Sequence, residues 1–175
     1  MHPPLARPIN VPPTHRCVLA VTTAWVLVPA AHATPADRWL MLSALAASLL
    51  HWCWYEHRSW RHGLDLACAT VLLVRVAVGG GGAWQWWWQL GLYAWMVFFL
   101  RRGKQHMLAH RYREHLVLHL LFRYLAFWAL YAHVQAPWDV WQWVKLSAAY
   151  VAHVVVTYQV AAWLLRRRGK GTCGV

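Results

Sequence analysis

Six apolar runs of 15 to 28 residues, separated by short polar or glycine-rich breaks, make up most of this chain. A helix needs about 20 mainly apolar residues to cross a bilayer, and the shorter runs can reach that length by including their polar flanks. The pattern therefore predicts an all-α, polytopic membrane helix bundle within residues 14–166. Its six expected transmembrane helices cover residues 17–31, 39–55, 64–78, 83–100, 115–136 and 138–165.

Both ends of the chain are expected to lie outside this bundle. Residues 1–13 contain five of the eight prolines and predict a disordered tail, and residues 167–175 form a basic C-terminal tail. The first apolar run ends in Ala31-His32-Ala33, which also fits a signal-peptidase site, so it is either a retained helix or a cleaved signal peptide. The short gap before the next run favours a retained helix.

The positions of the basic residues predict the orientation of the bundle. Of the 17 Lys and Arg residues, 13 fall in the tails or in the breaks that a six-helix layout places on one side. Only Arg38 falls on the other side, and Arg75, Arg123 and Lys145 lie within the apolar runs. Cytoplasmic loops are enriched in Lys and Arg, so both termini should be cytoplasmic.

The composition supports a membrane protein over a soluble one. The chain is 60% hydrophobic and 13% charged, whereas soluble domains carry roughly 25% charged residues. A formal charge of +12 would suggest nucleic acid as the partner of a soluble protein. No nucleic-acid-binding module accompanies the charge here, so membrane lipids are the expected partners. The four cysteines have neither paired spacing nor a C-x-x-C, so nothing in the sequence favours a disulfide framework or a zinc knuckle.

Polar residues within the apolar runs gather at one predicted depth. His51 falls near the cytoplasmic end of the second expected helix, and Asp65 falls at the start of the third. His115 and His119 open the fifth helix; they share a face because they are four residues apart, and Arg123 continues it one turn deeper. Ionisable groups within a membrane are costly, so such a cluster is a candidate functional site.

Two interpretations of this cluster are open. Three imidazoles beside a carboxylate form a ligand set that zinc uses, with one position left for water. In the other interpretation the histidines bond lipid phosphate or backbone carbonyls at the headgroup boundary, and Arg123 pairs with Asp65 or Glu56. Arg75, deep in the third helix, also needs a partner, and Asp37 and Asp139 are the acids within its reach.

The same residues resemble the CREST superfamily of membrane hydrolases, which includes the alkaline ceramidases and the adiponectin/progestin receptors. The resemblance lies in a Ser/His element at Ser48 and His51, in Asp65, and in the H-x-x-x-H of His115 and His119. It implies zinc bound by the three histidines, with Asp65 positioning or deprotonating its water and Ser48 nearby. The implied reaction is hydrolysis of a lipid amide or ester at the cytoplasmic leaflet. The family usually has seven helices, and its serine lies four residues before the histidine, where this chain has Ala47.

Two other functions are compatible with the pattern. The chain could be a non-enzymatic structural or transport-associated bundle, in which the intramembrane polar residues hold helices together. His133 and His153, on the fifth and sixth expected helices, could instead be haem ligands, which the cores of helix bundles can supply.

Overall fold

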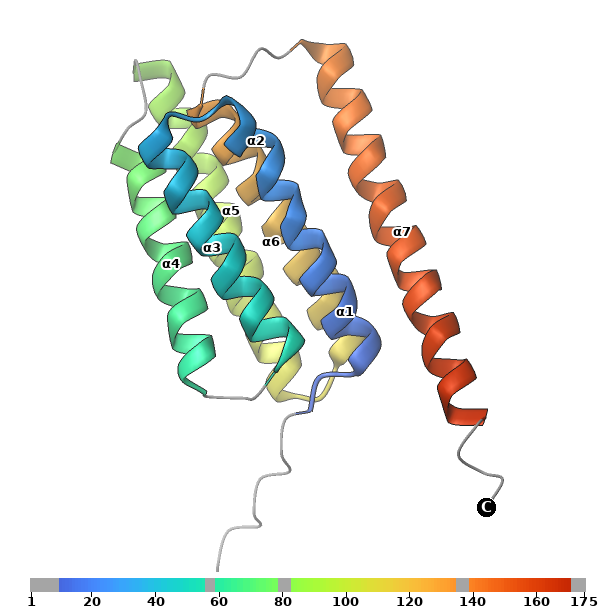
Figure 1. The fold of residues 1–175 in the computed structure, drawn as a ribbon. Helices are drawn as coiled ribbons and strands as arrows, with labels where there is room; N and C mark the ends of the chain where they lie inside the picture. Colours follow the sequence, from blue (N-terminus) through green and yellow to red (C-terminus); the bar gives the residue numbers. More distant parts are fainter. Residues whose placement is uncertain (1–9, 56–58, 79–82, 135–138, 171–175) are drawn as a thin grey trace, which may run out of the picture.

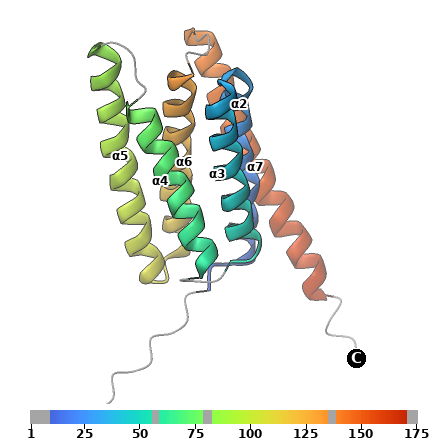
Figure 2. The same cartoon turned by 60° about the vertical axis from the view of Figure 1, so that its left-hand side comes forward.

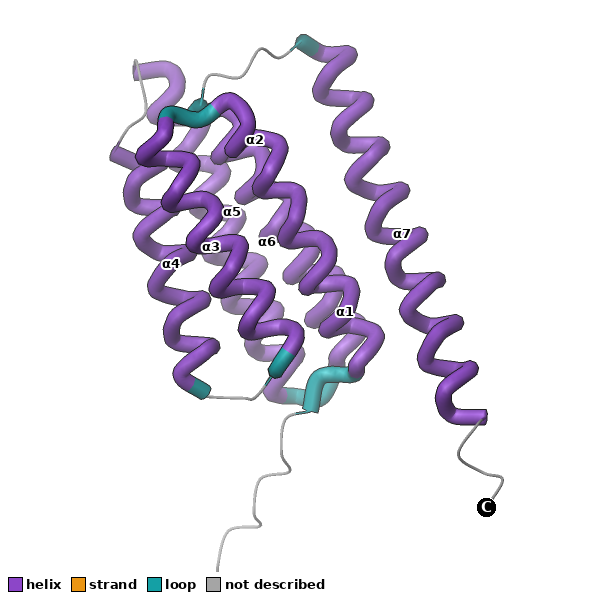
Figure 3. Tube along the Cα trace, in the orientation of Figure 1, coloured by secondary structure: helices purple, strands orange, loops and turns teal. Residues whose placement is uncertain are grey.

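The computed structural model describes residues 10–55, 59–78, 83–134 and 139–170, and within these ranges every regular element is helical (Figure 3). The first rod combines α1 (Pro13–Thr22), a 3₁₀ segment η1 (Thr23–Val26) and α2 (Leu27–His32). The other helices are α3 (Pro35–Cys53), α4 (Trp60–Val78), α5 (Ala83–Leu108), α6 (Tyr112–His133) and α7 (Val140–Lys170). With the first rod counted as one, the described residues form six helices, and the all-α prediction is confirmed.

Successive helices run in opposite directions, so the start of α1 and the end of α7 lie at the same end of the molecule (Figure 1). We call this the terminal end and the other the far end. The α5 helix packs along α6, α3 packs along α4, and α1 lies against both α3 and α7. The α7 helix leans away from the rest toward the terminal end, as Figures 1 and 2 both show.

Three of the helices are long and apolar enough to cross a membrane. The other three described helices, α3, α4 and α5, do not reach the same combination of length and apolar composition; α4, for example, has Arg61, Asp65 and Arg75 among its 19 residues. Length and composition thus support three of the six predicted membrane helices directly. The three are Pro13–His32, Tyr112–His133 and Val140–Arg167.

Some helix ends differ from the sequence-based expectation. The α3 helix begins at Pro35 rather than residue 39, because the Thr34 side chain caps it by accepting the Asp37 N–H at 3.3 Å. The α5 helix continues past residue 100 to Leu108, and much of the expected basic connection is therefore helical. Similarly, α7 continues to Lys170, three residues beyond the expected start of the C-terminal tail; residues 1–9 and 171–175 lie outside the described residues.

The apolar core fills the far half of the bundle, where α3, α4, α5 and α6 meet. Met41, Val76, Met96 and Leu130 are among its fully or almost fully buried side chains. A smaller cluster around Trp52 fills the terminal half between α1, α3 and α6. The apolar surface left on the outside of the bundle, most of all along α7, fits contact with lipid.

Candidate functional site

The guanidinium of Arg123 lies inside the bundle and joins α6 to α1 and α3. Its Nη1 donates to the Leu19 carbonyl, to Thr22 Oγ1 at 3.0 Å and to Thr23 Oγ1 at 2.7 Å. Its Nη2 donates to Ser48 Oγ at 3.2 Å. A buried cation is therefore satisfied by oxygens of two neighbouring helices, which lowers the cost of burying it.

The break in the first rod supplies one of these oxygens. The backbone N–H of Thr23 donates to the carbonyl of Ala20, three residues earlier. In a regular α-helix this N–H would instead donate to the carbonyl of Leu19, four residues earlier. The Leu19 carbonyl then accepts from the Thr23 hydroxyl at 2.9 Å and from Arg123. The 3₁₀ segment thus lies where α1 exposes a carbonyl to the buried cation.

Asp65 on α4 lies near this network, and the charge of Arg123 acts on its carboxylate. Within the described residues there is no direct Arg123–Asp65 ion pair. The expectation that Arg123 pairs with Asp65 is therefore not met: its donors go to hydroxyl and carbonyl groups. The other expected partner, Glu56, lies outside the described residues.

Trp52 contacts one histidine from each of two neighbouring pairs. His119 lies edge-on to Trp52, with ring centroids 5.2 Å apart, and 5.5 Å from the ring of His115. His51 lies 4.7 Å from the Trp52 ring and 5.0 Å from that of His62 on α4. The four imidazoles therefore come from three helices, and two of them contact the indole of Trp52 at the terminal end.

Tyr55 closes the cluster beyond the end of α3. Its hydroxyl donates to the sulfur of Met107 on α5 at 3.6 Å. Burial raises the pKa of Tyr55 to about 12, so the phenol is protonated at physiological pH and does not serve as a base.

His115 is held in one tautomer. Its Nδ1 lies 3.0 Å from the carbonyl of Gly103, and because a carbonyl only accepts, Nδ1 carries the proton. The other nitrogen, Nε2, is buried and has no hydrogen-bond partner within the part of the chain that the structure describes. Metal-binding histidines commonly show this arrangement, with one nitrogen donating to a carbonyl and the other open.

The predicted zinc ligands are only partly brought together. His115 and His119 lie side by side, but no three His, Cys, Asp or Glu side chains of the described residues are grouped closely enough to hold one ion. Of the predicted catalytic residues, Ser48 accepts a hydrogen bond from Arg123, and Asp65 lies near enough for the charge of Arg123 to act on it.

Sequence reasoning missed several residues of this region. His15 on α1 is only 5% exposed, and its Nδ1 is buried without a partner. His15, Leu19 and Thr22 are spaced three or four residues apart and form one buried stripe. That spacing was visible in the sequence, as was the polar Thr22-Thr23 pair inside an apolar run.

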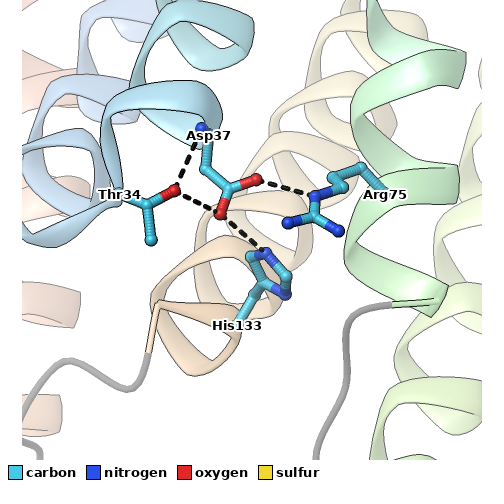
Figure 4. Close-up of polar contacts among 4 residues, drawn as sticks. All are labelled: Thr34, Asp37, Arg75 and His133. Atoms are coloured by element: carbon cyan, nitrogen blue, oxygen red, sulfur yellow. Dashed lines mark hydrogen bonds and ion pairs between the residues drawn. The ribbon is translucent and has the colours of Figure 1, made fainter.

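A second polar cluster lies at the far end and is centred on Asp37 (Figure 4). Arg75 Nε donates to Asp37 Oδ1 at 2.9 Å, which confirms Asp37 as the partner of Arg75. The Thr34 hydroxyl donates to Oδ2 at 2.9 Å, and His133 Nε2 lies 3.7 Å from the same oxygen. The other acid considered, Asp139, instead caps α7 by accepting the backbone N–H of Gln142 at 2.6 Å. This cluster joins α3, α4 and α6.

The two histidines considered for haem contact protein groups in separate places. His133 faces Asp37, whereas Nδ1 of His153 accepts a hydrogen bond from Trp25 Nε1 at 2.8 Å. Each imidazole is therefore occupied in holding helices together, and nothing in their placement favours haem.

No protein-family model matches this chain, and no curated protein or solved structure matches it significantly. The likeness to the CREST superfamily therefore depends on the five residues that carry it and on their arrangement near the terminal end. Those residues are Ser48, His51, Asp65, His115 and His119.

Proposed function

We propose that this chain is a multi-pass membrane protein whose six helices all cross the bilayer, with both termini in the cytoplasm. The alternating helix directions support this topology, as does the concentration of basic residues at the terminal end. On this proposal the Arg123 network lies toward the cytoplasmic leaflet and the Asp37 cluster lies toward the opposite one.

Within this topology the chain acts as a non-enzymatic bundle of a structural or transport-associated kind. The observation that carries this function is the bonding of Arg123, whose donors go to protein oxygens on α1 and α3. Asp37 plays the same part at the far end, between Arg75 and His133. The charged groups of both clusters thus connect helices, as intramembrane ion pairs and hydrogen bonds do in other bundles.

A second candidate function is zinc-dependent hydrolysis of a lipid amide or ester at the cytoplasmic leaflet. The tautomer of His115, with Nδ1 on a carbonyl and Nε2 open, favours it, as does the adjacent ring of His119. Zinc, when bound, would polarise a carbonyl and lower the pKa of a bound water. Since His51 does not complete a three-residue group with these two among the described residues, no step is assigned to Ser48 or Asp65.

Metal analysis separates the two functions. The protein is purified without a metal-binding tag, and bound metals are measured by mass spectrometry for the wild type and for His119→Ala. The bundle predicts a wild type with only trace metal. About one zinc ion per chain, lost in His119→Ala, would favour the hydrolase instead. His32→Ala is the matched control, because His32 is exposed at the far end and its loss should leave the metal content unchanged.

A further inference from the structure

A groove at the terminal end of the molecule lies between the first turn of α1 and the last turns of α7. It is lined by Thr14 on α1 and by four residues of α7, namely Tyr158, Ala162, Leu165 and Arg166. In Figure 2 the C-terminal part of α7 lies farther from the other helices than its beginning does. On the proposed topology it faces the cytoplasmic leaflet.

The lining combines an apolar wall with a cation at its mouth. Ala162 and Leu165 form the apolar part, and no carboxylate is among the lining residues. Arg166 is exposed and donates through Nε to the Ala162 carbonyl at 3.2 Å, while its two Nη groups make no hydrogen bond within the described residues. The neighbouring Trp163 is 47% exposed, so the apolar surface continues outside the groove.

A buried imidazole beside the groove has an unused nitrogen. The ring of His15 lies 6.2 Å from that of Tyr158, which lines the groove. His15 is 5% exposed, and its buried Nδ1 has no hydrogen-bond partner among the described residues. The charge of Arg113, in the first turn of α6, acts on this imidazole, so a second cation lies close to this end of α1.

The start of α1 adds further donors. Pro12 occupies the N-cap position and provides no side-chain hydrogen bond to the first turn. Uncapped N–H groups at a helix start carry a partial positive charge and favour an anion. Together with Arg166 and Arg113, they make this corner of the protein cationic and rich in donors.

We propose that this groove binds an anionic membrane lipid, with its phosphate headgroup near Arg166 and the first turn of α1 and an acyl chain along α7. The complementary charge favours such a lipid, and the cytoplasmic leaflet is the one enriched in anionic lipids. The apolar wall formed by Ala162 and Leu165 fits an acyl chain. The position relative to the leaflet depends on the proposed topology, but the binding preference does not.

Lipid titration of the detergent-solubilised full chain, followed by native mass spectrometry, tests the proposal. Dioleoyl phosphatidic acid should bind at least about tenfold more tightly than dioleoyl phosphatidylcholine. The double variant Arg113→Gln/Arg166→Gln should remove most of that preference. Arg101→Gln/Arg102→Gln is the matched control, because it removes the same charge from exposed residues of α5 at the same end, and it should keep the preference.

Three results would overturn the proposal. Equal binding of the two lipids would show that the groove does not select an anionic headgroup. An equal loss in both double variants would show diffuse attraction to the whole basic end. Displacement of phosphatidic acid by millimolar inorganic phosphate would show a site for a soluble anion instead of a lipid. Because the titration is done in detergent, these results are independent of whether the topology and the bundle function are correct.

Discussion

Arg123 donates a hydrogen bond to Ser48 across 3.2 Å. A hydroxyl on α3 therefore accepts from a cation on α6. Hydroxyl and carbonyl oxygens take the place of the direct ion pair that the sequence suggests, and the bond makes the energies of Arg123 and Ser48 interdependent.

The first prediction concerns that interdependence. Arg123→Ala should destabilise the folded protein by about 2–4 kcal/mol, because it leaves buried oxygens without a donor. In a Ser48→Ala background the same change should cost less, with a coupling of about 1 kcal/mol. Chemical unfolding in detergent of the wild type, both single variants and the double variant measures it. Strictly additive costs would show that the two side chains act independently.

The second prediction concerns the hydroxyl at the break of α1. Thr23→Val keeps the shape of the side chain but removes both its bond to the Leu19 carbonyl and an acceptor of Arg123. We expect a loss of about 1–2 kcal/mol in the free energy of unfolding. Ser43→Ala is the control, since its exposed hydroxyl bonds only the Trp39 carbonyl of its own helix, and it should change stability by less than about 0.5 kcal/mol. Similar losses in both variants would contradict a special role for Thr23.

The third prediction ranks the residues of the far-end cluster. Asp37→Asn should destabilise the protein more than Arg75→Gln. The Asp37 side chain is only 8% exposed and contacts Arg75, Thr34 and His133, whereas the Arg75 side chain is 50% exposed. Expected losses are about 2–3 kcal/mol for Asp37→Asn and about 1 kcal/mol or less for Arg75→Gln. Thermal unfolding of the two variants measures the order, and the reverse order would contradict this description of the cluster.

The fourth prediction tests the packing of α5 against α6. A Cβ at Gly103 would meet His115 Nδ1 and Leu118 Cβ at 3.6 Å, which is ordinary van der Waals contact. Gly103→Ala should therefore be tolerated, and it should stabilise the protein by up to about 1 kcal/mol through helix propensity. Gly103→Leu should destabilise it, because the larger side chain has to displace His115. A strongly destabilised alanine variant would mean that the two helices lie closer than described.

The periodicity of apolar residues predicts where the helices lie, whereas tertiary contacts decide where a helix is interrupted. The apolar runs are long and regular, so the six helices were predictable. The pairing of Arg75 with Asp37 was predictable because only five acids exist in the chain. The break at Thr23–Val26 was not, since it depends on the position of Arg123, 100 residues later in the chain.

The candidate site was likewise predictable only in part. The positions of His51, His115 and His119 along their helices predicted that all three lie near one end of the bundle, and they do lie there. The depth of a residue does not fix how its helix is rotated, and Trp52 contacts one imidazole of each pair. The burial of His15 was missed because it lies in the first turn of α1, next to the proline-rich segment that was expected to be disordered.

Membrane topology is the central claim, and accessibility of single cysteines tests it most directly. Cysteines replace Lys104 at the terminal end of α5 and, in a second variant, Asp139 at the far end before α7, each in a background without Cys17, Cys53, Cys68 and Cys173. Intact cells and opened cells are then labelled with a membrane-impermeant maleimide. The account predicts labelling of residue 139 in intact cells and of residue 104 only after the membrane is opened. Labelling of both positions under the same condition would contradict it.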